Sequence, residues 1–361
     1  MMDSANLQDL SCIRVGYVPC SNTLDSPGDR RRFIYYASKR GIRFEIADPD
    51  KEYDLVILSA LADISVWRSY PKAKLVYDLV DSYLAIPRTN LKGWLRGLFK
   101  FLLRQSRYLQ LDHWKAIGAM CVRADAVVCS TEEQRRDISK YCHNVHIILD
   151  AHMGVTRRAK TNYSAARPFR LVWEGLPQNL GSLKLIRPVL DKLRGLYPLE
   201  VHVVTDHEYF QFMGKYKKTS ALKIARQILP DVHFHEWNEA DFADIICSCD
   251  LAIVPLNLHD PFAAGKPENK LLLFWRMAMP VVTSASPAYL RAMQSAGMDL
   301  VAKHEADWLA RLDLLMGDEE ARCEAGTLGK AYVDLEFSET AILRRWDAVF
   351  ASMGFVFTPQ V

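Results

Sequence analysis

The stretch "CDLAIVPLNLHDPFAAGKPENKLLLFWRMAMPVVTSASPAY", residues 249–289, predicts two buried strands that are joined by a buried helix. Residues 250–257 and 280–285 are largely apolar runs of strand length, without the alternation of a strand that faces water on one side. Between them, residues 271–279 are apolar on nearly every helical face except at Arg276, so the helix should be buried too. A strand, a helix and a second strand in this order are typical of a parallel α/β sheet.

Two lysines stand at the start of this helix, where they are unexpected. Pro267 suits the first helical position because its fixed φ and missing N–H cost nothing there. Lys266 and Lys270 then lie at the positive end of the helix dipole, which favours anions. Two explanations are open: Glu268 compensates the lysines, or an anion from outside the chain binds beside them.

The composition indicates a soluble globular protein of two domains. The chain of 361 residues exceeds one ordinary core, and half of its residues are apolar and a quarter charged. A net charge of +3 gives no general reason to expect nucleic acid as a partner. No apolar stretch approaches the ~18–20 residues of a membrane-spanning helix, and the first residues do not resemble a secretion signal. Because the eight cysteines follow neither a zinc nor a disulfide pattern, we expect a cytoplasmic protein.

Strand-like runs alternate with helical patterns and fall into two sets. The first set is 13–19, 44–47, 54–60, 74–81, 125–130 and 145–150; the second is 169–175, 199–206, 231–237, 250–257 and 280–285. Each set predicts a doubly wound parallel sheet of the Rossmann-like kind, with a ligand cleft bounded by the carboxyl ends of the strands. The expected domains are 1–155 and 169–337, with a linker at 156–168 and a C-terminal helix at 338–361 that crosses back to the N-terminal domain.

The segment 249–289 resembles the donor-binding region of GT-B-fold glycosyltransferases, particularly the family-4-like enzymes of bacterial surface-polysaccharide pathways. In that family a strand of the "-aDv-i-P-" kind precedes a "-NKL-EYma-GlPVi-S-" segment, and Asn269, Lys270 and Pro280 are in step with it. Residues 124–138 also resemble the last strand and helix of the family's N-terminal domain. Two familiar donor contacts are missing, because Leu273 replaces the glutamate that binds the ribose and Leu176 lies near a position that grips the pyrophosphate.

The resemblance implies a nucleotide-sugar site in the C-terminal domain. Lys266 and Lys270 would hold the phosphates, and Glu268 would replace the missing ribose carboxylate. Trp237 ends the strand 231–237, where related enzymes contact the base, although it also suits a packing role at a rim. The expected donor-binding residues are Gly175, Asn179, Gly181, Trp237, Lys266, Glu268, Asn269 and Lys270. The segment with the first three also reads as an ordinary strand–helix turn.

Candidate catalytic residues lie at the carboxyl ends of strands of the N-terminal domain. Sugar transfer needs a carboxylate or an imidazole near the acceptor hydroxyl. Asp81 is the favoured candidate, with Asp78 and His152 as further ones, although an Asp can cap a turn and a His can be structural. Gly28, Asp29 and Arg30, after the first strand, are expected acceptor contacts; turn-and-cap chemistry also explains the first two.

No metal is expected. The sequence "DPD" at 48–50 imitates a metal-binding signature, but proline between two aspartates after a strand favours a turn. The alternating histidines of "HFHE", 233–236, lack an evident third ligand.

Residues 90–110 predict a basic helix that lies on a membrane. Lysine and arginine recur every four residues, and tryptophan and leucine occupy other faces. The expected interfacial residues are Lys92, Trp94, Arg96 and Lys100. The same pattern fits an amphipathic helix that packs on its own sheet.

Taken together, these features favour a metal-independent glycosyltransferase that uses a nucleotide-sugar donor and no cofactor. Its acceptor would be a glycan or a lipid-linked glycan in surface polysaccharide synthesis, which would place the protein at the inner face of the cytoplasmic membrane. Two alternatives remain open: a nucleotide-sugar epimerase, and a non-catalytic GT-B-like protein that has lost its donor contacts.

Overall fold

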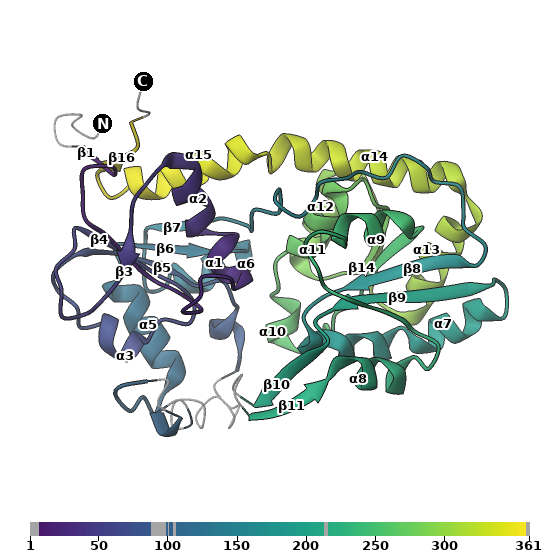
Figure 1. Ribbon diagram of the computed structural model, residues 1–361, viewed down its shortest axis with the longest axis horizontal. Coiled ribbons are helices and arrows are strands. Elements are labelled where there is room, and N and C mark those ends of the chain that lie inside the picture. Colours follow the sequence, from purple (N-terminus) through teal and green to yellow (C-terminus); the bar gives the residue numbers. More distant parts are fainter. Residues whose placement is uncertain (1–6, 88–98, 100, 104–105, 213–215, 359–361) are drawn as a thin grey trace. The chain divides into compact units, whose positions relative to one another are not determined.

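The computed structural model describes residues 7–87, 99, 101–103, 106–212 and 216–358 (Figure 1). The chain divides into two compact units: Met1–Ala151 with Glu339–Val361, and His152–Ser338. We call them unit 1 and unit 2. Each is built on a six-stranded parallel sheet.

The sheet of unit 1 has the order β3-β2-β4-β5-β6-β7. Its strands are β2 (Val15–Val18), β3 (Glu45–Ile46), β4 (Leu55–Leu58), β5 (Lys74–Asp78), β6 (Ala126–Cys129) and β7 (Val145–Ile147). The interior strands β4 and β6 are buried at every position, as expected of strands covered on both faces. Because β2 connects to β3 on one side while β4 lies on the other, the strand order reverses between β2 and β4.

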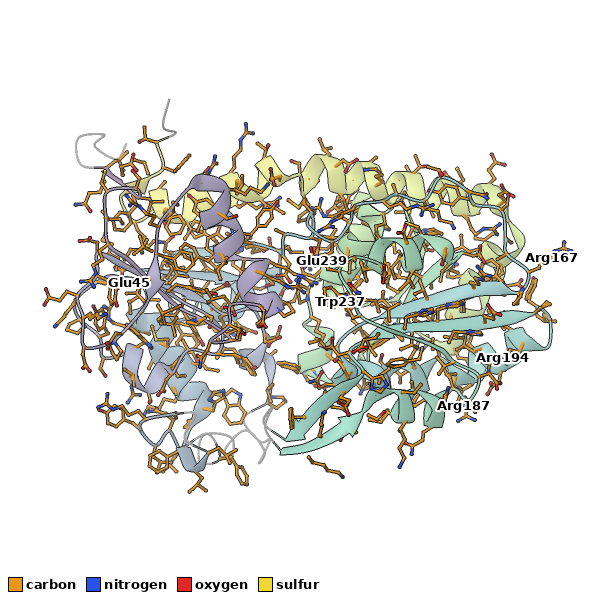
Figure 2. All side chains as sticks on the ribbon, in the orientation of Figure 1. Glu45, Arg167, Arg187, Arg194, Trp237 and Glu239 are labelled. Atoms are coloured by element: carbon orange, nitrogen blue, oxygen red, sulfur yellow. The ribbon has the colours of Figure 1, made fainter. Side chains whose placement is uncertain are left out.

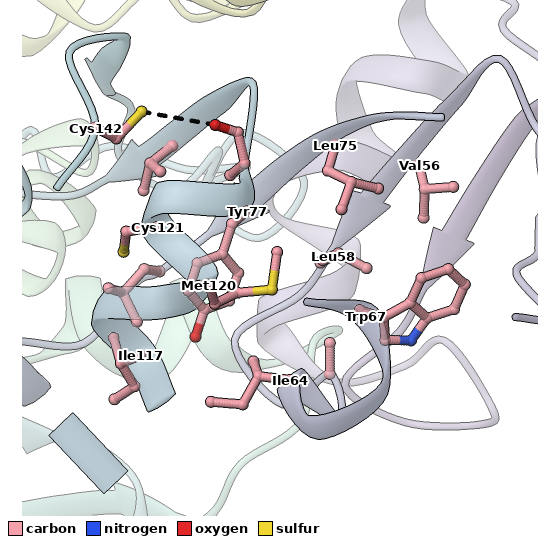
Figure 3. Close-up of a cluster of buried hydrophobic side chains, with 14 of the residues drawn as sticks. Val56, Leu58, Ile64, Trp67, Leu75, Tyr77, Ile117, Met120, Cys121 and Cys142 are labelled. Carbon is pink, nitrogen blue, oxygen red and sulfur yellow. Dashed lines mark hydrogen bonds between the residues drawn. The ribbon is translucent and has the colours of Figure 1, made fainter. Parts of the chain in front are cut away.

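Helices cover both faces of this sheet. The described helices and 3-10 segments are α1 (Pro27–Arg30), α2 (Phe33–Arg40), α3 (Ile64–Trp67), η2 (Tyr83–Ala85), α5 (His113–Arg123), α6 (Glu132–Ile138) and α15 (Glu339–Ala351). Helices α3 and α5 pack on β4 and β5 through a buried cluster that includes Leu58, Trp67, Tyr77 and Met120 (Figure 3). Each large apolar side chain in such a cluster contributes about 1.5–3 kcal/mol.

An aromatic cluster joins α2 to α15, although some 300 residues separate the two helices in sequence. Phe33 and Tyr36 of α2 contact Trp346 and Phe350 of α15, with ring centroids 5.3–6.4 Å apart. Tyr36 also donates a hydrogen bond to Asp347 at 2.9 Å. Beside this helix, β1 (Gln8–Asp9) pairs with β16 (Phe355–Val356). These contacts include the C-terminal helix in the core of unit 1.

The sheet of unit 2 has the order β12-β9-β8-β13-β14-β15. Its strands are β8 (Phe169–Glu174), β9 (Leu199–Thr205), β12 (His233–Glu236), β13 (Leu251–Val254), β14 (Val281–Ser284) and β15 (Val301–Ala302). The order reverses between β8 and β13, which pair with each other but connect onward to opposite sides. In open α/β sheets such a reversal is where ligands bind, beyond the carboxyl ends of the strands.

Helices also lie on both faces of the second sheet (Figure 1). They are η3 (Pro177–Leu185), α7 (Arg187–Arg194), α8 (Ala221–Ile228), α9 (Phe242–Ser248), α10 (Pro261–Ala264), α11 (Asn269–Arg276), α12 (Pro287–Ser295), α13 (Glu305–Gly317) and α14 (Glu319–Glu336). Helix α11 is the helix of the quoted stretch. Its residues Leu271–Trp275 are all buried, as the apolar pattern predicts.

The predicted fold class is confirmed, with local differences. Helix α11 begins at Asn269 with Glu268 as its N-cap, so Pro267 precedes the helix. Three features were not predicted: the short strand β15, the pair of β1 with β16, and an antiparallel hairpin of β10 (Glu208–Phe212) and β11 (Tyr216–Ser220). Strand β15 has only two residues, too few for a recognisable periodicity. Among the described residues, no helix has both the length and the apolar character needed to cross a bilayer.

Candidate functional site

The point of strand reversal in unit 2 brings together two segments that are far apart in sequence. One runs from the end of β8 into η3 and includes Glu174, Gly175 and Asn179; the other is the start of α11 with the turn before it and includes Lys266 and Lys270. Both lysines reach across to the β8 side, over sequence separations of 87 and 96 residues. Most of the predicted donor-binding residues therefore lie in one place.

Lys270 is held tightly against the end of β8. Its Nζ donates hydrogen bonds to the backbone oxygen of Glu174 at 2.6 Å and to the carboxylate Oε2 of Glu174 at 3.0 Å. The same Nζ lies 5.6 Å from the ring centroid of Trp173, within the range of a cation–π contact. The question raised by the sequence thus has an answer that the sequence did not offer: Glu174 of β8 pairs with Lys270.

Lys266 lies in the turn before α11 and donates a hydrogen bond from Nζ to the side-chain oxygen of Asn179 at 2.9 Å. This bond fixes the position of the lysine beside the β8 turn. Asn269 occupies the first helical position, and the backbone oxygen of Glu268 accepts the N–H of Leu272 at 3.0 Å. The positive end of α11 thus lies next to both lysines.

Gly175 is required by the close approach of Lys270. A Cβ atom at this position would lie 2.7 Å from Lys270 Nζ and 2.8 Å from the Trp173 ring. The backbone oxygen of Gly175 accepts a hydrogen bond from Thr205 Oγ1 at 2.6 Å, which fixes the turn to β9. Gly181, by contrast, is exposed on η3, and an added Cβ would meet nothing within 4 Å.

A buried tyrosine, Tyr289, lies near two carboxylates of the site. Burial raises the pKa of Tyr289 far above its usual range, and the nearby carboxylates Glu268 and Glu174 raise it further. Tyr289 is 1% exposed and therefore stays neutral. Leu273, the leucine that the sequence resemblance aligned with a ribose-binding glutamate, is buried at 2% exposure.

Trp237 and Glu239 follow β12 at the edge of the unit 2 sheet where the strands have their carboxyl ends (Figure 2). The N–H of Trp237 bonds to Thr205 O at 3.0 Å, and its ring contacts Phe242 at 6.1 Å between centroids. The side chain is half-buried, so one face packs on unit 2 and part of it meets solvent.

The corresponding edge of unit 1 carries a buried ionic cluster. Arg32 is 1% exposed and forms a two-pronged bond with Asp78, from Nε at 2.6 Å and from Nη2 at 2.7 Å. Its Nη1 donates to the backbone oxygen of Ile148 at 3.0 Å and to Asp150 at 3.1 Å. Asp78 is 4% exposed, and both of its oxygens bond to Arg32, so its geometry is that of a structural partner.

Asp81 differs from Asp78 in its surroundings. It lies three residues beyond β5, is half-buried and accepts a hydrogen bond from the Tyr83 hydroxyl at 3.4 Å. His152, the third predicted catalytic residue, is 2% exposed, and its backbone oxygen accepts the N–H of Val155. Of the three, Asp81 has the greatest access to solvent.

The loop after β2 is organised around Asp29. This buried carboxylate accepts hydrogen bonds from Tyr17 Oη at 2.6 Å, from the backbone N–H groups of Cys20 and Ser21 at 2.7 and 3.0 Å, and from Ser21 Oγ at 3.3 Å. A Cβ at Gly28 would lie 2.9 Å from Cys20 Sγ. Asp29 is 0% exposed, so it shapes the loop while the half-buried Arg30 beside it faces outward in part.

Several other predictions concern metals and membranes. Asp50 N–H bonds to Asp48 Oδ1 at 3.0 Å, which is the turn expected of "DPD". Within the described residues, no group of three His, Cys, Asp or Glu side chains is arranged to hold a metal ion. The predicted interfacial residues Lys92, Trp94, Arg96 and Lys100 lie outside the described residues.

The histidines of β12 form a stack with a third histidine that was not predicted. The ring centroid of His202, in β9, lies 4.9 Å from that of His233 and 5.2 Å from that of His235. The Nδ1 atom of His202 is 2.9 Å from Nε2 of His235. Glu200 lies 3.4 Å from His202 Nε2. Burial lowers the pKa of His202 and of His235 below the usual value.

These lowered pKa values predict that unit 2 loses stability as the pH falls below about 6.5, the ordinary value for His. Below that pH the unfolded chain takes up protons that the folded stack resists, so the free energy of unfolding decreases. Urea unfolding between pH 8 and 5.5 should show this slope, and His202→Gln should flatten it. An equal slope for both proteins would contradict the assignment to the stack.

No family model and no curated protein matches the sequence. Solved structures do match, over most of the chain. HepE from Anabaena, solved with UDP and glucose, matches with a TM-score of 0.64 at 12% identity over 94% of this chain and 100% of its own. WaaG, a glycosyltransferase involved in lipopolysaccharide biosynthesis, matches with a TM-score of 0.54 at 12% identity over 93% and 99%.

Two other matches broaden the comparison. A Listeria monocytogenes protein assigned as a UDP-N-acetylglucosamine 2-epimerase has a TM-score of 0.50 at 10% identity, over 94% of this chain and 96% of its own. TarM has a TM-score of 0.55 at 12% identity over 82% of this chain, which spans only 54% of the length of TarM. Together with the two parallel sheets, these matches show that the chain has the GT-B fold.

Proposed function

We propose that this protein is a glycosyltransferase that binds the diphosphate of a nucleotide sugar at the start of α11. The observation that carries the proposal is the convergence of Lys266 and Lys270 on the β8 turn, at the point where the strand order of unit 2 reverses. Structural neighbours that are named as glycosyltransferases, or that were solved with UDP and glucose, support it.

Each part of the donor would meet a different group. The lysines and the amides at the start of α11 would bind the two phosphates and stabilise the leaving diphosphate in place of a metal ion. Glu268 would accept hydrogen bonds from the ribose, and Trp237 would stack on the base. Gly175 leaves space for Lys270, and the missing side chain would let the phosphates approach the backbone.

Unit 1 would bind the acceptor, which we propose is a glycan or a lipid-linked glycan of surface polysaccharide synthesis. Asp81 would take the proton of the attacking hydroxyl, because its carboxylate is the most accessible of the candidates. The loop held by Asp29, with Gly28 and Arg30, would border the acceptor. A lipid-linked acceptor would bring the protein to the inner face of the cytoplasmic membrane.

Two other functions have specific support. The fold is shared with a protein assigned as an epimerase, which would convert its donor without any acceptor. The leucines at 176 and 273 instead favour a non-catalytic protein that has lost donor contacts. Product formed from donor alone would identify the first, and absence of nucleotide binding would identify the second.

The test is a thermal-shift screen with UDP-, GDP-, dTDP- and ADP-sugars, followed by calorimetry with the stabilising compound. Lys270→Ala should weaken binding of that compound at least tenfold, or about 1.4 kcal/mol, because a cation beside the phosphates is lost. Lys192, whose exposed side chain pairs with Glu305 at 2.7 Å, provides the control, since Lys192→Ala should leave binding unchanged. Unchanged binding by Lys270→Ala would exclude the start of α11 as the diphosphate site.

A further inference from the structure

The ion pair between Glu174 and Lys270 stands where the proposed site needs positive charge. The Glu174 side chain is 12% exposed and that of Lys270 is 27% exposed, so water screens the pair only in part. Lys270 uses two of its three N–H groups on Glu174 and can direct the third towards a ligand. Glu174 therefore fixes the position of the ammonium group and at the same time cancels its charge.

This cancellation affects the two diphosphates of the reaction differently. The diphosphate of a nucleotide sugar is esterified at both ends and carries about two negative charges. The nucleoside diphosphate that is left after transfer ends in a free phosphate and carries about three, because the second ionisation of a phosphate has a pKa of about 6. Repulsion by a nearby carboxylate grows in proportion to the charge of the ligand.

We propose that Glu174 is a specificity-determining residue that disfavours the nucleoside diphosphate product relative to the nucleotide-sugar donor. The inference rests on the proposed function, since it concerns the same site. A diphosphate at the start of α11 would lie within reach of Lys270, whose Nζ is 3.0 Å from the Glu174 carboxylate. The ionised Glu174 carboxylate repels the three charges of the product more strongly than the two charges of the donor. Product release is then favoured over retention.

The structure also explains why a carboxylate is needed for this effect. Glutamine at position 174 would keep an oxygen that accepts the Lys270 hydrogen bond, and the bond to the backbone oxygen would stay. The position of Lys270 and the space at Gly175 would be unchanged, and only one negative charge would be lost. Glu174→Gln thus separates the charge of the residue from its role in holding the lysine.

The experiment measures dissociation constants by calorimetry for UDP, GDP, dTDP and ADP, each paired with its glucose conjugate. Wild type, Glu174→Gln and a control variant are compared at pH 7.5. Glu305→Gln is the control, because it removes the same charge from an exposed Lys–Glu pair in the same unit. For the pair that wild type binds, Glu174→Gln should lower both dissociation constants, and the factor for the diphosphate should be at least about five times that for the glucose conjugate. The control variant should change neither constant.

A second measurement at pH 5.5 uses the ligand's own ionisation. At that pH the terminal phosphate of the diphosphate carries about one charge, so diphosphate and conjugate become alike. The preference created by Glu174→Gln should then shrink towards that of wild type. A preference that is independent of pH would overturn the charge argument.

The remaining outcomes separate this inference from the proposed function. If wild type binds one pair and Glu174→Gln leaves the ratio of the two constants unchanged, the inference fails and the function stands. Weaker binding of the glucose conjugate alone would also overturn it, because Glu174 would then act on the sugar. If wild type binds no member of any pair, the proposed function fails and the inference fails with it.

Discussion

Replacing Arg32 by alanine should lower the stability of unit 1 by about 3–5 kcal/mol. Arg32 and Asp78 are both nearly inaccessible to water, and Arg32 makes four hydrogen bonds across β5 and the chain after β7. Without the guanidinium, the Asp78 carboxylate stays buried without its charged partner. Most of the loss comes from this stranded charge and much less from the attraction between the two groups.

Hydrogen exchange followed by mass spectrometry is the suitable measurement, because a chain of two units does not have to unfold in one step. Protection should fall in peptides from β2, β5 and β7 and stay unchanged in unit 2. Arg14→Ala is the matched control: Arg14 pairs with Glu45 at 2.6 Å, but both side chains are exposed, so the expected loss is below about 1 kcal/mol. Equal losses in the two variants would contradict a buried structural pair.

A second pair of variants tests the origin of the effect. Asp78→Leu added to Arg32→Met should recover a large part of the stability, since apolar residues of similar size can replace a buried ion pair. If the double variant is as unstable as Arg32→Ala, the cluster contributes through its shape or its backbone contacts.

The architecture could be predicted from sequence because it depends on local patterns. The continuous apolar runs at 250–257 and 280–285 became β13 and β14, and the apolar helix between them became α11. The pattern fails where the element is short, as in β15, or where two strands form a hairpin outside the six-stranded sheet, as in β10 and β11.

The site could be predicted only in part, because its decisive contacts are not local. Lys270 was recognised from its place at the start of a buried helix, but its partner Glu174 lies 96 residues away, and only the pairing of β8 with β13 brings the two segments together. Arg32 is the last of three consecutive arginines, and only Arg30 belongs to a helix, since α1 ends there and α2 begins at Phe33. The sequence alone could not show which arginine is buried.

Replacing Asp81 by asparagine should reduce kcat by about 10²–10⁴-fold, because Asp81 is the proposed general base. Asparagine has the shape of aspartate and can still accept the Tyr83 hydrogen bond, but it cannot take a proton from the acceptor hydroxyl. Donor binding in unit 2 should be unchanged, so the KM for the donor should stay close to that of wild type. The loss would thus lie in turnover and leave affinity intact.

This turnover is measured as the release of nucleoside diphosphate from the donor found in the screen. Glycans and lipid-linked glycans serve as acceptors. Asp137→Asn is the control, because Asp137 pairs with Lys140 on the surface of the same unit and should not affect the rate. Asp78→Asn distinguishes the two aspartates: it should destabilise unit 1 through the loss of charge opposite Arg32, whereas Asp81→Asn should keep normal hydrogen-exchange protection. Turnover by Asp81→Asn within about threefold of wild type would exclude Asp81 as the base, because asparagine cannot accept the proton.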